Sequence, residues 1–311
     1  MVCKAAHCMQ QFLGSKKPIK VGGSAFQGTF FEDIILEAML RIEKEQTMAQ
    51  RVTANDLRRL IEEFVSEYPL QAKVRSWWRS PLLATARADD RFKVLPEIAA
   101  DDHVLPWQLL QTAKTVIVFF LPFAEALSLE NSPGKRPCRN WGLAYQDTNR
   151  LIGKISERIL RYLAERGYRS ALTPATHNFD AVKLMSRWSH KHLAYLSGLG
   201  RFGVNAQLIT PSGCSGRLGS LVTEADLGDS ALVATKELCL HRAGEECLEC
   251  VRRCPVDAVK QKGIVRERCW GRLNSNLKDW DAFAGLEDTT HVCGKCVVDL
   301  PCSLKAPMPI G

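Results

Sequence analysis

The sequence of 311 residues lacks long hydrophobic segments, and no apolar run approaches the ~20 residues that a membrane-spanning helix needs. Its first residues contain neither the apolar stretch of a signal peptide nor a twin arginine, so we expect no export signal. Hydrophobic residues make up 46% of the chain and charged residues 24%, which is typical of a globular protein with a substantial core. We therefore expect a cytoplasmic protein with no membrane partner and with reduced thiols.

Acidic residues are also in short supply, with 34 Asp and Glu against 42 Lys and Arg, which gives a formal net charge of +8. A basic protein attracts anionic partners. This balance is compatible with an acidic protein, a phosphorylated cofactor or RNA as a partner. At roughly 150 residues a domain, the length indicates about two domains.

Cysteine, in contrast, is abundant, and eight of the 12 cysteines fall in the last quarter of the chain. The stretch Cys247-x2-Cys250-x3-Cys254-Pro255 is most of the run found in bacterial proteins with two [4Fe–4S] clusters, in which the last cysteine ligates the other cluster. Two such clusters need eight thiolates, which is the number of cysteines in the last quarter of the chain. The sequence therefore predicts two [4Fe–4S] clusters and a role in electron transfer.

The position of the first cysteine departs from the regular run. A regular first cysteine would stand where Gly244 is, so Cys239 must reach in from a longer loop. Crossing of the last ligand then predicts two sets of four. Cluster 1 takes Cys239, Cys247, Cys250 and Cys302, and cluster 2 takes Cys254, Cys269, Cys293 and Cys296.

Two other uses of these cysteines remain open. Zinc also takes four thiolates at Cys-x-x-Cys spacing, but the crossing Cys-x-x-x-Cys-Pro pattern has no role in an ordinary zinc knuckle. Eight cysteines also suffice for four disulfides, which a reducing compartment disfavours. Of the other cysteines, Cys138 is expected to be a buried free thiol, while Cys3 and Cys8 lie in a loosely docked arm with no assigned role.

Hydrophobic patterns before the cysteines indicate an α/β fold. Residues 114–122 predict a strand buried on both faces, residues 144–166 a long amphipathic helix, and residues 168–174 a second strand. Helices are also expected at 31–49, from 53 to a stop at Tyr68-Pro69, and at 190–199, whereas 70–110 is expected to be mostly irregular.

The central and C-terminal parts resemble the epoxyqueuosine reductases and their relatives, the corrinoid-containing reductive dehalogenases. Four motifs carry the resemblance, in the family's order and followed by the cysteines: residues 198–205 (GLGRFGVN), 208–211 (LITP), 213–220 (GCSGRLGS) and 223–227 (TEADL). The similarity covers roughly residues 110–303.

The resemblance implies a fold and two cofactors. The expected fold is an α/β domain (an α+β sandwich of the nitroreductase-like, corrinoid-binding kind) followed by a two-cluster ferredoxin-like module. The implied domains are an N-terminal helical or irregular extension (1–110), a cobalamin-binding domain (111–235) and the cluster module (236–311). Cobalamin would bind base-off.

A corrin needs close backbone approach, which glycine allows, and hydrogen-bond donors around its rim. The residues expected to supply this surface are Gly198, Gly200, Gly203, Asn205, Thr210, Gly213, Cys214, Ser215, Gly216, Gly219 and Ser220.

Catalytic candidates are groups that deliver a proton near the cofactor. Tyr145, Asp180 and His190 are the residues we select. The family carries an acidic group before its glycine motif, but this chain has Leu184 near that place. Longer family members also have a tRNA-binding repeat domain after the clusters, which has no counterpart here, so tRNA is a partner that the sequence does not support.

The sequence therefore predicts a cobalamin-dependent iron–sulfur reductase that acts on a small molecule or a modified nucleoside and receives electrons from a low-potential donor such as ferredoxin or flavodoxin. The alternatives are an electron-transfer or corrinoid-activating protein without a substrate of its own, and a redox sensor. Substrate and oligomeric state are not specified by the sequence.

Overall fold

A computed structural model describes residues 51–173, 179–230 and 236–310 of the chain. Its centre is a mixed α/β arrangement around a four-stranded sheet with the order β1-β2-β8-β3, in which all neighbours are antiparallel. The strands of this sheet are β1 (Leu82–Arg87), β2 (Thr115–Pro122), β8 (Gly216–Thr223) and β3 (Ser170–Leu172). The α/β character predicted from the sequence is thus observed, and the expected helix at 31–49 lies outside the described residues.

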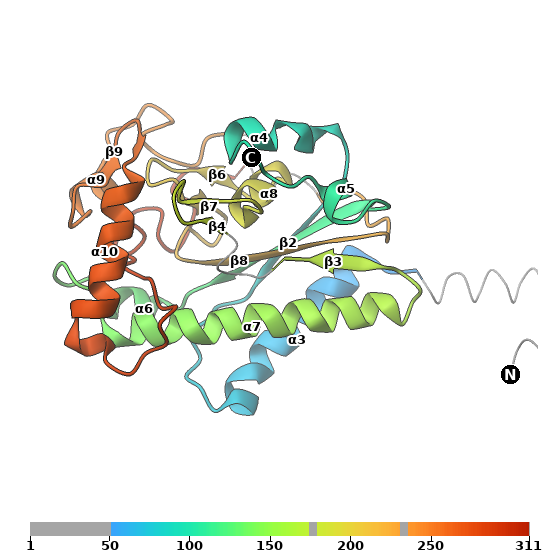
Figure 1. Cartoon of the computed structure of the whole chain (residues 1–311), viewed down its shortest axis with the longest axis horizontal. Helices are drawn as coiled ribbons and strands as arrows, with labels where there is room; N and C mark the ends of the chain where they lie inside the picture. Colours follow the sequence, from blue (N-terminus) through green and yellow to red (C-terminus); the bar gives the residue numbers. More distant parts are fainter. Residues whose placement is uncertain (1–50, 174–178, 231–235, 311) are drawn as a thin grey trace, which may run out of the picture. The chain divides into compact units, whose positions relative to one another are not determined.

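Strand β2 is buried along its whole length, as its unbroken apolar sequence predicts. Because side chains alternate along a strand, Ile117, Phe119 and Leu121 pack into one hydrophobic core while Val116 and Val118 pack into a second core on the other face. Helices cover both faces of the sheet (Figure 1).

Two long helices form the first layer. They are α3 (Ala54–Ala72) and α7 (Arg139–Ala164). A capping box starts α3, since the Thr53 side chain accepts from the Asp56 backbone while Asp56 accepts from the Thr53 backbone. The expected stop at Pro69 is wrong: α3 continues to Ala72, and the next residue, Lys73, closes the helix with a φ of 53°.

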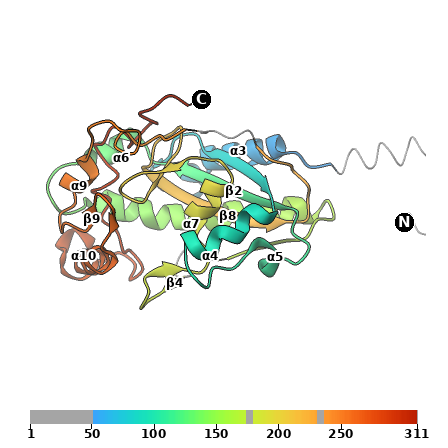
Figure 2. The same ribbon diagram turned by 90° about the horizontal axis from the view of Figure 1, so that it is seen from above.

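Short elements form the second layer (Figure 2). These are the 3-10 helix η1 (Asp90–Val94), α4 (Leu95–Ile98), α5 (Pro106–Leu109) and α8 (His190–Leu196). The indole of Trp188 is fully buried here and donates to Ser220 Oγ of β8 at 3.0 Å, which fixes the start of α8 against the sheet.

Strand β1 lies within residues 70–110, which were expected to be mostly irregular. Strand β1 forms a six-residue ladder with β2. Its Ala84, Thr85 and Ala86 give little sequence signal, because alanine has low strand propensity. The strand is held by its pairing with β2 and by Ser230, which accepts from the Thr85 backbone at 2.9 Å. The division of the chain at 110/111 and 235/236 stays a prediction.

The cysteine-rich segment is short on regular structure. Its elements are α9 (Glu249–Arg252), β9 (Val259–Lys260), β10 (Gly263–Ile264), α10 (Arg266–Asp279) and the 3-10 helix η2 (Asp281–Phe283). Two further hairpins precede it in the chain: β4 (Phe179–Asp180) with β5 (Met185–Ser186), and β6 (Arg201–Phe202) with β7 (Leu208–Ile209).

Backbone hydrogen bonds join the cysteine-rich segment to the turn before β8. The Cys214 and Ser215 amides donate to the carbonyls of Cys302 and Ser303, each at 2.9 Å. Gly213 has a φ of +81°, and a side chain there would collide with the Ser303 backbone, so a glycine is required for this close approach.

Within the described residues, no helix has both the length and the apolar character required to span a membrane.

Candidate functional site

Eight cysteines of the C-terminal segment line two cavities, which lie where this segment meets the sheet. The small thiol cavity is lined by Cys239, Cys247, Cys250 and Cys302, together with Gly203, Val204 and Asn205. The large thiol cavity, of about 270 Å³, is lined by Cys254, Cys269, Cys293 and Cys296 among other residues. The large cavity is also lined by a fifth cysteine, Cys214, and the assignment of four thiols to each of two clusters stays a prediction.

Local structure explains why neighbouring cysteines face different cavities. Cys250 lies within the single helical turn α9, and Cys254 follows just after it. Cys269 lies in the first turn of α10, which brings it beside Cys254 and Cys293. The Cys293–Cys296 loop turns at Gly294 (φ +75°), where the Trp141 ring packs so closely that a side chain would collide with it.

Burial and mutual proximity make these thiols difficult to ionise on their own. Burial, and then the neighbouring cysteines, raise the pKa of Cys250 and of Cys269 to about 11. Burial also raises the pKa of Cys296, followed by the effect of Cys293 and Cys269. Such groups become thiolates when a metal compensates their charge, so the chemistry of each set of four suits an iron–sulfur cluster.

The ten cysteines in the described part of the chain are all free thiols. Within the same residues, no three His, Cys, Asp or Glu side chains are grouped so that they could hold a single metal ion. Cys138 is half-buried, and burial raises its pKa. Cys3 and Cys8 lie outside the described residues.

Cys214 is a ninth thiol, located between the two sets. It is buried, lines the large thiol cavity, and donates to Cys302 Sγ of the other set over 3.9 Å. Asn205 Nδ2 donates to Cys214 at 3.8 Å and to the Cys296 carbonyl at 2.7 Å. The hydrogen bond to Cys302 and burial raise the Cys214 pKa well above its ordinary value.

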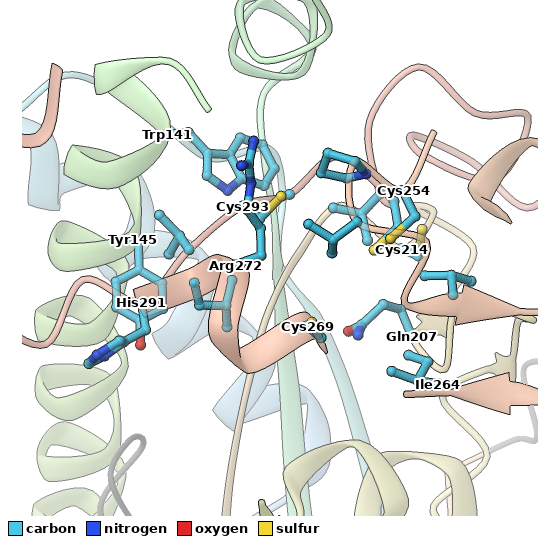
Figure 3. Close-up of a pocket in the computed structure, with 18 of the residues that line it drawn as sticks. Trp141, Tyr145, Gln207, Cys214, Cys254, Ile264, Cys269, Arg272, His291 and Cys293 are labelled. Atoms are coloured by element: carbon cyan, nitrogen blue, oxygen red, sulfur yellow. The ribbon is translucent and has the colours of Figure 1, made fainter. Parts of the chain in front are cut away.

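The wall opposite the cysteines contains a paired cation and phenol. Arg217, in β8, stacks on the Tyr145 ring of α7 with its guanidinium carbon 4.1 Å from the ring centroid. Among the residues that the structure describes, buried Arg217 Nε has no hydrogen-bond partner. Burial lowers the Arg217 pKa and the Tyr145 contact opposes this effect. Figure 3 shows Tyr145 projecting from α7 into the cavity.

Only one of the three expected catalytic residues lies in this cavity. Tyr145 lines it, whereas Asp180 and His190 do not. The Asp180 carboxylate accepts from the Val182 and Lys183 amides at 2.8 and 2.7 Å and so shapes the β4–β5 turn. His190 Nδ1 is 2.7 Å from Ser220 Oγ, the hydroxyl that also accepts from Trp188.

Of the eleven residues expected to face a corrin, only four line one of the two thiol cavities. Cys214 and Gly216 line the large thiol cavity, and Gly203 and Asn205 line the small one. The other seven, Gly198, Gly200, Thr210, Gly213, Ser215, Gly219 and Ser220, line neither.

Three of these glycines make close approaches inside the protein itself. A side chain at Gly200 would meet the Ile209 carbonyl, and one at Gly219 would meet the Phe119 ring on the neighbouring strand. Gly213 faces the Ser303 backbone in the same way. These glycines allow packing between elements of this chain.

Arg217 is the candidate site residue that the sequence reasoning missed. The alternation of side chains along β8 offered a signal. Arg217 lies two residues before Gly219 and four before Leu221, so all three are on the same face of the strand. Leu221 packs in the core on the side of α7, which places Arg217 on that inward face as well. A cation on the inward face of a strand is unusual unless it has a function or a partner.

A buried lysine supports the Cys293–Cys296 loop. Lys295 Nζ donates to the Asn131 carbonyl at 2.5 Å and to the Pro133 carbonyl at 2.9 Å. Burial lowers its pKa, while Cys293 opposes the shift. Lys295 therefore ties two cysteines of the large cavity to the chain that precedes α7.

We expect Lys295→Met to leave these two carbonyls without a donor, at a cost of about 1–3 kcal/mol in the free energy of unfolding. Iron bound at the large cavity should then be lost to a chelator several-fold faster than in the unmodified protein. Lys278→Met, at an exposed position of α10, is the matched control. Equal iron-release rates for both variants would contradict this role of Lys295.

Known proteins similar to this chain were found only among solved structures. No protein-family model and no curated protein matches the chain. Among solved structures, the chain is similar to a selenomethionine-labelled epoxyqueuosine reductase, with 15% identity, a TM-score of 0.48, and coverage of 82% of this chain and 68% of that one. It is also similar to epoxyqueuosine reductase from Bacillus subtilis (16% identity, TM-score 0.43, 81% and 68% covered).

A third similar structure is a catabolic reductive dehalogenase in complex with 3-bromo-4-hydroxybenzoic acid. The identity is 14%, the TM-score 0.48, and the match covers 72% of this chain but only 30% of the dehalogenase. The structural neighbours are thus epoxyqueuosine reductases and reductive dehalogenases, the two groups whose motifs the sequence resembles.

Proposed function

We propose that this protein is a reductase that holds two [4Fe–4S] clusters and a corrinoid. One observation carries the proposal: eight thiols form two separate sets of four, and one set shares its cavity with the Tyr145–Arg217 pair. Electron-carrying ligands and a proton-bearing side chain thus lie around the same space, as a reduction requires.

In this proposal each set of four thiolates holds one cluster. Cys239, Cys247, Cys250 and Cys302 hold cluster 1, and Cys254, Cys269, Cys293 and Cys296 hold cluster 2. Cluster 2 is the inner one because its ligands border the large cavity. When bound, the clusters supply single electrons and the corrinoid supplies a strongly reducing cobalt centre.

The large cavity is the proposed place for the reactive face of the corrinoid. Phe123, Trp141 and Val297 give it apolar walls. Cys214 and Gly216 are the members of the expected corrin-facing set that reach it. The cavity shares lining residues with a second one of about 600 Å³, so that more than 270 Å³ is open to a large cofactor.

Tyr145 is the proposed proton donor. Its hydroxyl releases a proton to the reduced substrate, and the guanidinium of Arg217 stabilises the negative charge that remains on the phenol oxygen. Arg217 Nε, which is buried without a hydrogen-bond partner, is available to orient a ligand.

An electron carrier or corrinoid-activating protein without its own substrate remains the alternative function. The Tyr145–Arg217 pair favours an enzyme, because electron transfer alone does not need a proton donor. A redox sensor, likewise, needs neither a proton donor nor a cavity for a substrate. The substrate in this proposal is an organohalide or epoxyqueuosine, free or in tRNA, and the electrons come from ferredoxin or flavodoxin in the cytoplasm.

The first test concerns cluster number and ligand sets. Anaerobic reconstitution should give eight irons per chain, since eight thiolates hold two four-iron clusters. Cys254→Ser and Cys269→Ser should lose the same cluster in electron paramagnetic resonance spectra, and Cys302→Ser the other. Cys138→Ser is the control and should keep eight irons. Four irons in the unmodified protein, or stoichiometric zinc, would contradict the proposal.

A second test fills the large cavity without removing a ligand. Val256 lines it, so Val256→Trp should weaken cobalamin binding more than about tenfold, which corresponds to ~1.4 kcal/mol. Iron content should stay at eight. Val182→Trp, at a residue 92% exposed, should bind cobalamin normally. Absence of any cobalamin affinity in the unmodified protein would leave the electron-carrier function.

A third test addresses the proton donor. Tyr145→Phe should keep iron content and cobalamin binding but lower anaerobic turnover of organohalide or epoxyqueuosine by about 10²–10⁴-fold, the usual contribution of general acid catalysis. Arg217→Gln should change turnover in the same direction. Tyr162→Phe, on the same helix but outside the cavity, is the control. Full activity of Tyr145→Phe would rule out this role.

A further inference from the structure

Cys214 lies between the two thiol sets, and the proposed function gives it no task as a ligand. Its side chain is 4% exposed and lines the large thiol cavity (Figure 3), yet its sulfur contacts Cys302 of the other set over 3.9 Å. Eight thiolates suffice for two four-iron clusters. A ninth thiol that is buried against one of the ligands can act on a cluster through that ligand.

The neighbours of Cys214 determine which way its hydrogen points. Asn205 Nδ2 donates to Cys214 Sγ at 3.8 Å, and an amide nitrogen cannot accept a hydrogen in return. Cys302, when it is a cluster ligand, is a thiolate and has no hydrogen to donate. The thiol hydrogen of Cys214 is therefore directed to Cys302 Sγ, so that Asn205 donates to Cys214 and Cys214 donates to Cys302.

Asn205 is held from both sides of its amide group. Its Nδ2 also donates to the Cys296 carbonyl at 2.7 Å, and its Oδ1 accepts from the Gln207 backbone at 3.2 Å. A flipped amide would place Oδ1 against the Cys296 carbonyl and lose both bonds. Asn205 is also buried, so water does not compete for these contacts. The group that orients Cys214 is thus anchored to the backbone of the other thiol set.

The main chain holds the two sulfur atoms together. The Cys214 amide donates to the Cys302 carbonyl at 2.9 Å, which aligns the two residues side by side. In the other set, Cys254 Sγ accepts from the Ala258 backbone amide at 3.1 Å. One ligand of each set therefore accepts a hydrogen bond, but only the donor to Cys302 is a side chain that a substitution can remove.

A hydrogen bond to a ligand sulfur stabilises a cluster most after the cluster has gained an electron, because the sulfur then carries more negative charge. Such a bond raises the reduction potential, and burial strengthens it. We propose that Cys214 donates its thiol hydrogen to Cys302 and so raises the reduction potential of cluster 1. A higher potential at this outer cluster favours capture of an electron from the donor protein. The inference rests on the proposed function, because it requires a cluster held by Cys302.

The test is an anaerobic redox titration of the reconstituted full chain, followed by electron paramagnetic resonance. Cys214→Ala and Cys214→Val both remove the donor, and valine keeps the volume of the side chain. Each should retain eight irons and lower the reduction equilibrium constant of cluster 1 about fivefold, which is ~41 mV for a one-electron couple. Cys214→Ser keeps a hydroxyl donor and should return the potential toward that of the unmodified protein. Cys138→Ala, at a half-buried thiol that lines neither thiol cavity, is the control.

Cluster 2 is the internal standard, and Cys302→Ser, which removes cluster 1, identifies the two signals. In the part of the chain that the structure describes, the Cys214 sulfur has its hydrogen bonds with Asn205 and Cys302 and none with a sulfur of the cluster 2 set. The potential of cluster 2 should therefore stay unchanged, whereas a general disturbance of packing would shift both clusters.

Either donor-free variant that retains eight irons decides the question. An unchanged cluster 1 potential, equal shifts of both clusters, or the same shift in Cys214→Ser as in Cys214→Ala overturns the inference. Loss of iron from both Cys214→Ala and Cys214→Val also overturns it, because Cys214 would then be a ligand. The proposed function fails on other grounds, namely the iron content and cobalamin affinity of the unmodified protein, so the two failures are distinguishable.

Discussion

The two backbone hydrogen bonds between residues 214–215 and 302–303 are the contact on which the site depends. They attach the end of the cysteine-rich segment to the turn that leads into β8, the strand that carries Arg217. The same contact places Cys302 against Cys214. The position of one thiol set relative to the Tyr145–Arg217 wall is therefore fixed by backbone geometry at a glycine, Gly213, that no other residue can replace without a collision.

Patterns that reflect burial or ligand chemistry were predictable from the sequence. The unbroken apolar run of β2 and the amphipathic period of α7 both predicted real elements, because each is buried in the way its pattern requires. The crossing of Cys254 and Cys302 predicts two sets of four ligands, and this assignment stays a prediction. In each case the sequence contains the physical cause of the structure.

Features whose sequence pattern fits more than one structure were not predictable. Pro69 lies within α3 because its missing hydrogen bond occurs in the last turn, where Lys73 and Val74 donate to its carbonyl. The sequence could not indicate that Gly219 receives the Phe119 ring rather than a cofactor. Nor could it indicate that Asp180 serves its own turn, since an acid in a loop has the same pattern whether it caps a backbone or faces a cavity.

The crossed thiol sets also affect how the protein folds. The small thiol cavity draws its cysteines from both ends of the segment between Cys239 and Cys302, and the four of the large cavity are spread over the 43 residues from 254 to 296 between them. Neither site can form from a short contiguous peptide, so the entropy of closing these loops must be overcome together. Assembly of the segment is therefore cooperative, and disorder at either end removes Cys239 or Cys302 from the small thiol cavity and leaves an incomplete set of ligands.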